Sequence, residues 1–265
     1  TSPIQIPDYI TLEGSIFGSE DESNEELTTL NSDDSHKGII GYNLKQVVLK
    51  NLKVTNGRGD NGGGISLSGG SLVTLDNIEI SSCSYGKKGG GLYISNSKDL
   101  IEILNTKIYD NNAISGSGIY ITNSPNITIE NTIIENNQNS GSSPNNKGAG
   151  IFIKGNDDTS SEQIILISNS EIRGNKALTA PAVFSHYAKV KLQNVLISGN
   201  YFLFNGGGEE VYPGGAVYSN HSDLSIINCT ITGNSYSTGD GNSGGIYLIN
   251  NPYTKTSIVN SIIWG

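Results

Sequence analysis

The sequence predicts an all-β protein, a parallel β-helix (solenoid) of about nine stacked coils, and three observations support that prediction. A string of three small residues, one aliphatic residue and one aromatic residue recurs along the chain. A second string, aliphatic-x-Asn-x-x-aliphatic-x-x-Asn, follows the first in the same order. Short runs with alternating aliphatic residues, such as Ile127-Thr128-Ile129, are typical of strands with one buried face. Units of about 26–34 residues cannot bury an apolar face alone, so we expect them to stack.

The first string is expected to begin one strand in every coil. Two of its copies read Gly89-Gly90-Gly91-Leu92-Tyr93 and Gly148-Ala149-Gly150-Ile151-Phe152. Its third small residue falls at positions 64, 91, 118, 150, 182, 216 and 245. Three small residues in a row predict a turn that needs positive φ or a close approach of two backbones.

The first asparagine of the second string is expected at a bend between two strands. Asparagine adopts left-handed backbone angles at low cost. Its side-chain amide can also bond the asparagine one coil above and one coil below. We therefore predict a structural ladder formed by Asn51, Asn77, Asn105, Asn131, Asn169, Asn194, Asn228 and Asn260.

The whole chain is expected to form one solenoid domain. Residues 38–265 carry the repeats and stop in mid-repeat, as a fragment of a longer chain would. Residues 1–37 are expected to form N-terminal coils with an acidic insertion at 19–36. A charge run of this kind is most simply a solvated loop or a short amphipathic segment that caps the open end. Alternatively, its carboxylate oxygens bind calcium.

These repeats resemble those of right-handed parallel β-helix proteins. The segments Gly62-Gly63-Gly64-Ile65, Gly214-Gly215-Ala216-Val217 and Asn260-Ser261-Ile262-Ile263-Trp264-Gly265 are similar to repeats of large bacterial surface proteins. Polymorphic outer-membrane proteins carry repeats of the Gly-Gly-Ala-Ile type. The resemblance implies a right-handed coil and a secreted or cell-surface location. It does not imply one activity, because the same coil carries lyases, epimerases, phage tailspikes and adhesins.

Charge and composition exclude some classes of partner. The chain has 25 acidic and 16 basic residues, a net charge of −9, which argues against nucleic acid recognised by bulk charge. No apolar run approaches the roughly 20 residues that span a bilayer as a helix. Cys83 and Cys229 lie about five coils apart, which is too far for a disulfide, so we predict two free thiols.

One aromatic position, occupied in six successive coils, is the strongest candidate for a binding surface. If the aliphatic residue before each ring faces inward, the ring faces outward. A row of rings at coil spacing could stack on the sugars of an extended glycan. Alternatively, the rings stack on one another and stabilise the sheet, or turn inward beneath an insertion. The residues are Tyr93, Tyr120, Phe152, Phe184, Tyr218 and Tyr247.

The sequence offers few catalytic candidates. Glycoside hydrolysis needs two carboxyl groups about 5–10 Å apart, and Glu102, Glu130 and Glu135 are candidates by residue type only. Arg58 and Arg173 lie in no recognisable carboxylate cluster, which counts against a lyase.

Two patterns in the sequence are weak candidates for metal sites. His186 and His221 follow the same strand in adjacent coils and are expected to lie close together, as turn residues or as a metal or acid-base site. Glu209, Glu210 and Asp240 lie in equivalent loops and are weak candidates for binding calcium, although no EF-hand spacing is present. No other cofactor is expected.

Together these features predict a non-catalytic module, secreted or on the cell surface, that acts as a stalk, an adhesin or a glycan-binding surface. Its expected partner is an extracellular polysaccharide or a glycan of a host or neighbouring cell. The alternative is a polysaccharide-active enzyme, a lyase or glycoside hydrolase with surface carboxylates. End-to-end self-association is a further expectation, because open solenoid ends expose strand edges.

Overall fold

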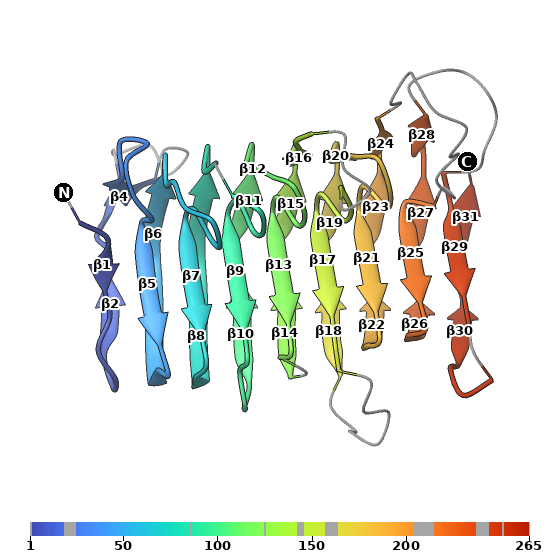
Figure 1. Cartoon of the computed structure of the whole chain (residues 1–265), viewed down its shortest axis with the longest axis horizontal. Helices are drawn as coiled ribbons and strands as arrows, with labels where there is room; N and C mark the ends of the chain where they lie inside the picture. The colour runs from blue at the N-terminus through green and yellow to red at the C-terminus, as the bar shows by residue number, and fades with distance from the viewer. Residues whose placement is uncertain are drawn as a thin grey trace.

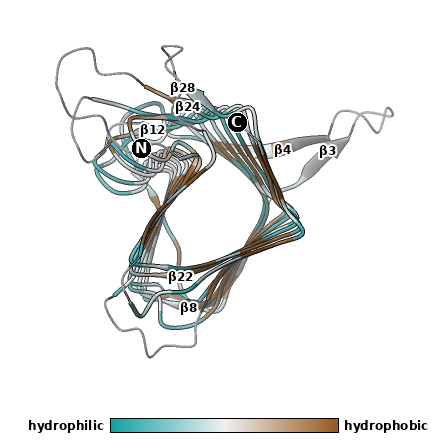
Figure 2. Cartoon of the chain, turned by 90° about the vertical axis from the view of Figure 1, so that its right-hand side faces the viewer, coloured by the Kyte–Doolittle hydropathy of each residue, from teal (hydrophilic) through white to brown (hydrophobic). Residues whose placement is uncertain are grey.

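A computed structural model of the chain describes residues 2–18, 25–84, 86–124, 126–141, 146–156, 164–203, 215–236, 244–250 and 252–264. Its coils lie side by side along the long axis, from the N-terminus at one end to the C-terminus at the other (Figure 1). Viewed along that axis, the coils superimpose around a common interior (Figure 2). The described residues contain strands and no helix, so none of them forms a helix that could cross a membrane.

The sheet that carries the aromatic position, here called the ring sheet, has nine parallel strands. Equivalent residues of neighbouring coils pair in register, so that Tyr120 lies between Tyr93 and Phe152. The strands, in sheet order, are β1 (Ile4–Gln5), β5 (Ile39–Tyr42), β7 (Ile65–Ser68), β9 (Leu92–Ser95), β13 (Ile119–Thr122), β17 (Ile151–Lys154), β21 (Val183–His186), β25 (Val217–Asn220) and β29 (Ile246–Ile249).

A second face follows the ring sheet in every coil. Its strands also pair in parallel, because each coil repeats the path of the previous one. They are β2 (Thr11–Glu13), β6 (Lys45–Thr55), β8 (Ser71–Ser81), β10 (Ile101–Leu104), β14 (Ile127–Glu130), β18 (Ile165–Ser168), β22 (Lys189–Gln193), β26 (Asp223–Ile227) and β30 (Thr256–Val259).

A third face completes the wall of the solenoid. The long strands β6 and β8 bend and contribute to both the second and the third face. The other strands of the third face are β4 (Glu25–Asn31), β11 (Lys107–Tyr109), β15 (Ile133–Glu135), β19 (Glu171–Arg173), β23 (Leu196–Ser198), β27 (Thr230–Thr232) and β31 (Ile262–Trp264).

Two smaller elements add to these faces. Within the predicted acidic insertion, β4 pairs antiparallel with β3 (Ile16–Gly18) as well as parallel with β6. A short five-stranded sheet lies between the third face and the next ring-sheet strand. It consists of β12 (Asn112–Ala113), β16 (Gln138–Asn139), β20 (Lys176–Ala177), β24 (Tyr201–Phe202) and β28 (Ser235–Tyr236).

The core consists of aliphatic columns that continue from coil to coil. Alternate residues of each strand point inward, so Ile101 and Ile103 of β10 are buried while Glu102 between them is partly exposed. Ile134 on β15 is fully buried in the same way. Burial of these columns stabilises the fold at roughly 25 cal/mol for each Å² of apolar surface removed from water.

All eight asparagines of the predicted ladder adopt left-handed backbone angles, with φ between 48° and 55°, at the bend between the second and third faces. Their side chains form an interrupted ladder. Asn77 bonds Asn51 at 2.9 Å and Asn194 bonds Asn169 at 3.0 Å, but Asn105 donates to Asp76. Carboxylates are stronger acceptors than amides, which explains the interruptions at Asn105 and Asn169, whose amides donate to Asp76 and Glu130.

The continuous ladder is formed by the second asparagine of each string, and this corrects the predicted assignment. Each of these amides except the last, Asn234, donates to the next one along the axis at 2.9–3.0 Å, and all five donate to a backbone carbonyl. The second asparagine turns into the corner of the coil, whereas the first points away from it in most coils. The ladder residues are Asn111, Asn137, Asn175, Asn200 and Asn234.

The last coil exposes apolar side chains. Ile258 and Ile263 continue the buried columns of Ile226 and Ile231, yet they are 45% and 40% exposed. Trp264 beside them is 76% exposed. These three side chains are among the exposed apolar residues of the second and third faces in the last described coil.

Candidate functional site

The six aromatic residues form a continuous stack outside the ring sheet, here called the ring column. Ring centroids of neighbouring coils lie 4.6–5.6 Å apart with interplanar angles of 5–26°. The stack follows from the register, because each aromatic residue comes directly after an inward aliphatic residue of its strand. The column consists of Tyr93, Tyr120, Phe152, Phe184, Tyr218 and Tyr247.

Stacking leaves little of these rings accessible. Tyr120, Phe184 and Tyr218 are only 4%, 3% and 7% exposed. Burial raises the pKa of Tyr120 to about 12. Because the ring faces cover one another along the axis, a ligand cannot insert a sugar between successive rings, and among Tyr120, Phe152 and Phe184 only Phe152 is partly exposed. The stack thus matches the alternative of mutual stabilisation, and its role in ligand binding stays a prediction.

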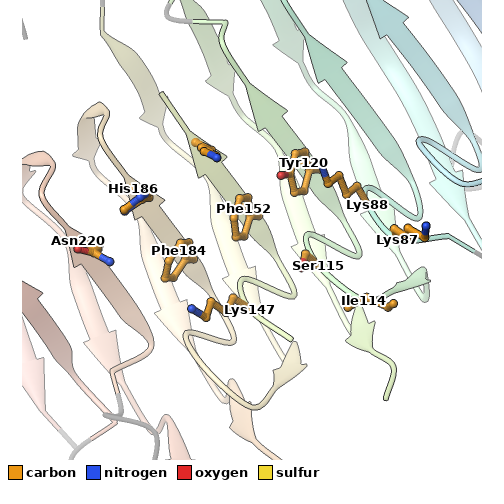
Figure 3. Close-up of a pocket in the computed structure, with 11 residues that line it drawn as sticks. Lys87, Lys88, Ile114, Ser115, Tyr120, Lys147, Phe152, Phe184, His186 and Asn220 are labelled. Carbon is orange, nitrogen blue, oxygen red and sulfur yellow. The ribbon is translucent and has the colours of Figure 1, made fainter. Parts of the chain in front are cut away.

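A groove of about 540 Å³ runs over the middle of the ring column. Figure 3 shows Tyr120, Phe152 and Phe184 in a row, with Lys88 and Lys147 beside them. We call this hollow the basic groove because, among the described residues that line it, the charged side chains are lysines, together with one histidine. Its lining residues are Lys87, Lys88, Ile114, Ser115, Tyr120, Lys147, Phe152, Lys154, Phe184, His186 and Asn220.

Two columns of side chains flank the rings. On one side, Lys88 pairs in register with Ser115 in the turn before the strand, and Lys147 occupies the same position in the following coil. On the other side, Lys154, His186 and Asn220 are register partners at the ends of their strands. The groove is thus a trough with an aromatic floor and polar or basic sides.

Lys88 and Lys147 contact aromatic rings and form no ion pair within the described part of the chain. Lys88 Nζ lies 5.3 Å from the ring centroid of Tyr120, and Lys147 Nζ lies 5.2 Å from that of Phe184. Burial lowers the pKa of Lys147. Within the described part of the chain, no carboxylate lines the groove or forms an ion pair with these lysines.

A second groove of about 600 Å³ continues from the first, since Lys87 and Ile114 line both. Its remaining lining residues include Asp34, Arg58 and Asp60. Arg58 therefore lies near carboxylates, contrary to the sequence expectation. The parallel register brings together residues that are about one repeat apart in the chain.

Arg173 is also part of a carboxylate cluster, which corrects the second half of that expectation. Its guanidinium bonds Glu135 at 2.8 Å and Glu171 at 2.7 Å, and Lys107 pairs with Glu135 at 2.9 Å. Burial alone would raise the pKa of Glu135, but hydrogen bonds from Lys107 and Arg173 outweigh it and lower that pKa. Both oxygens of Glu135 are thus engaged in ion pairs.

The other carboxylates considered for catalysis also have structural partners. Glu102 accepts a hydrogen bond from Thr74 at 3.1 Å, and Glu130 accepts one from Asn169 at 3.1 Å. Nothing in the described structure pairs either one with a second carboxylate across a groove.

The two histidines lie close together, as predicted. The ring centroids of His186 and His221 are 6.4 Å apart, and Tyr187 stacks on His221 at 5.3 Å. No group of three histidine, cysteine or acidic residues suited to a metal ion occurs among the described residues. The calcium candidates Glu209, Glu210 and Asp240 lie outside the described residues, so that prediction stays open.

Both cysteines are free and buried, which confirms the prediction of two free thiols. Cys83 occupies the position of the buried asparagine ladder, where its N–H donates to Asn111 at 3.0 Å. Burial raises the pKa of the Cys83 thiol to about 12 and also raises that of Cys229. A thiol that stays protonated is a poor nucleophile and a poor metal ligand.

A family model described as "Right handed beta helix region" matches residues 16–157, more than half of the chain. The chain therefore belongs to the right-handed β-helix family. No curated protein and no solved structure shows significant similarity to it. The family establishes the fold and the handedness and leaves the activity open.

Sequence reasoning overlooked the lysines of the basic groove. A signal was present, because Lys88 and Lys147 each directly precede the small-residue string of their coil. The sequence alone does not show that Ser115 lies between these two lysines or that each lysine contacts a ring of the following coil. Both facts require the register of the strands.

Proposed function

We propose that the chain is a non-catalytic module, secreted or displayed on the cell surface, that binds polysaccharide in the basic groove. The observation that carries this proposal is the trough itself, with the edges of Tyr120, Phe152 and Phe184 as its floor and polar side chains on both sides. Ring edges offer apolar contact to sugars, and lysine, serine and asparagine side chains offer hydrogen bonds.

The lining of the groove supports binding without catalysis. Hydrolysis of a glycosidic bond ordinarily needs two carboxyl groups across the bond. Among the described residues that line the basic groove, none carries a carboxyl group. The enzyme alternative would instead have to use the second groove, where Asp34 and Asp60 lie.

A surface location is proposed on the resemblance of the repeats to those of bacterial surface proteins, including the polymorphic outer-membrane type. An elongated solenoid also suits a stalk, because added coils extend it without changing its cross-section. In this proposal the stacked coils act as a stalk that holds the basic groove away from the cell surface.

The test is a glycan array read with and without calcium, combined with analysis of reaction products. We expect retained binding to at least one polysaccharide and no cleavage. Lys154→Glu, on the side of the basic groove, should reduce that binding, whereas Lys191→Glu on the second face should not. Calcium-dependent binding would point to the acidic loop residues.

Released oligosaccharides would contradict the non-catalytic assignment. In that case Asp34→Asn and Asp60→Asn would show whether the second groove is responsible. Binding that Lys154→Glu and Lys191→Glu leave equally unchanged would contradict the assignment of the site to the basic groove.

A further inference from the structure

Lys88 and Lys147 repeat the same arrangement two coils apart. Both precede the small-residue string of their coil, and Ser115 takes this position in the coil between them. Both reach over the ring of the following coil, at 5.3 Å from the centroid of Tyr120 and 5.2 Å from that of Phe184. The groove thus presents two cations on this side, in coils separated by one that carries Ser115.

The spacing of these two cations follows from the coil geometry. Neighbouring parallel strands are about 4.8 Å apart, so two coils separate equivalent residues by roughly 10 Å. Two sugar residues of an extended polysaccharide cover a similar length. A chain lying along the axis would therefore meet one of these lysines once per disaccharide.

The charge of the groove is opposite to that of the molecule. The chain has a net charge of −9, yet four lysines and one histidine line this groove with no described carboxylate among them. Lys147 is half-buried, and burial of a cation without a counter-ion costs free energy. An anionic ligand would offset that cost.

We propose that the basic groove binds an acidic polysaccharide of alternating sequence, with one carboxylate or sulfate per disaccharide, lying along the solenoid axis. Successive anionic groups bind Lys88 and Lys147, and the intervening sugar contacts Ser115 and the edge of Phe152. Lys154 and His186 contact the other edge of the chain. This inference rests on the proposed function and adds to it the chemical class and the direction of the ligand.

A single-stranded nucleic acid is the competing polyanion. Proteins that bind such strands stack bases on the faces of aromatic side chains. Here those faces are occupied by neighbouring rings at 4.6–4.9 Å around Phe152. The geometry therefore favours a ligand that uses ring edges, as a sugar chain can.

The test is isothermal titration calorimetry with oligosaccharides of equal length. Hyaluronan supplies one carboxylate per disaccharide, κ-carrageenan supplies one sulfate, and carboxyl-reduced hyaluronan is the neutral control. Polygalacturonate supplies a carboxylate on every sugar, and oligo(dT) represents nucleic acid. We expect hyaluronan or κ-carrageenan to bind at least about tenfold more tightly than each of the other probes, as one lost charge-assisted hydrogen bond predicts. The better of the two identifies the anionic group.

Variants locate the anionic groups. Lys88→Met and Lys147→Met keep the length of the side chain and remove its charge, and each should weaken binding about tenfold. Lys88→Arg and Lys147→Arg should retain most of it. Lys98→Met, in an exposed turn of the same coil as Lys88, is the matched control and should bind as the parent does. Thermal unfolding establishes that every variant is folded.

The outcomes separate the two proposals. Equal binding of neutral and acidic hyaluronan would overturn this inference and leave the proposed function standing. Tighter binding of polygalacturonate would overturn the alternating pattern. Tighter binding of oligo(dT) would replace the polysaccharide with nucleic acid. Absence of binding to every polysaccharide here and on the array would overturn both proposals.

Discussion

At the scale of single residues, the two asparagines of each string have different roles. Asn131 provides the left-handed bend and makes one hydrogen bond to Asn105, at 3.4 Å. Asn137 is fully buried and bonds Asn111, Asn175 and the carbonyl of Ile108, all near 3.0 Å. The amide of Asn137 thus lies in the interior, where a polar group without a hydrogen-bond partner lowers the free energy of unfolding.

We therefore expect Asn137→Ala to lower the free energy of unfolding by about 2–4 kcal/mol, because it leaves buried groups of its neighbours without partners. The matched variant Asn131→Gly keeps the left-handed bend and removes an exposed amide, so we expect a change within about 0.5 kcal/mol. Urea unfolding measures both values. Equal costs for the two variants would contradict the distinction between the two asparagines.

Cys83 provides a second prediction at this scale. Its thiol pKa is raised from 9.0 to about 12, so the folded protein holds this proton more tightly than the unfolded chain. The associated stability is complete below pH 9 and is lost as the pH rises toward 12. At pH 8 we expect a thiol reagent to modify neither cysteine in the native protein and both after denaturation. Rapid modification of the native protein would show that the assigned burial is wrong.

The sequence could predict these residues only in part. The repeated strings revealed both asparagines, but the strings do not show which side chain turns into the corner of the coil. In the same way, Glu135 and Arg173 lie side by side because they occupy equivalent positions of two neighbouring coils, although 38 residues separate them in the sequence. Repeats of unequal length hide such a pair until the register is known.

At the scale of elements, parallel register aligns side chains of β11, β15 and β19 into an ion-pair network on the third face. Glu135 is the central member, since it pairs with both Lys107 and Arg173. Its side chain is only 14% exposed, whereas its partners are 41% and 43% exposed. Ion pairs at such positions make modest contributions to stability, which salt reduces.

Glu135→Gln is expected to lower the free energy of unfolding by about 1 kcal/mol at pH 7. The pKa of Glu135 is lowered on folding, so its contribution is complete above the ordinary value of 4.5 and disappears as the pH falls below it. Unfolding titrations at pH 7 and pH 3 test this dependence. A cost that is the same at both pH values would mean that packing, and not charge, explains the effect.

Alternation within single strands allowed the inward faces to be predicted from sequence, and the buried Ile127 and Ile129 illustrate this success. The antiparallel pairing of β3 with β4 could not be predicted, because the acidic segment around it lacks that alternation. The basic groove was missed for a related reason. One wall comes from turns and the other from strand ends of different coils, so no single strand reveals the groove.

At the scale of the whole molecule, repeated coils give the ring column and the basic groove the same direction as the solenoid axis. A ligand in this groove meets aromatic and polar side chains in several successive coils, which suits a polymer better than a compact small molecule. The same repetition leaves the last described coil with exposed strand edges and apolar residues.

That open coil leads to the prediction of end-to-end self-association. Burial of Ile258, Ile263 and Trp264 against a second copy would remove exposed apolar surface. Sedimentation velocity over a concentration series should show an association that Ile263→Glu abolishes. A monomer at every concentration would contradict the prediction.

The most direct test of the account is a crystal structure of the chain with an oligosaccharide selected by calorimetry. We predict electron density for the sugar chain parallel to the solenoid axis, over Phe152, with anionic groups within hydrogen-bond distance of Lys88 and Lys147. Density that crosses the coils at right angles, or that occupies another face while the basic groove contains only water, would contradict the central claim.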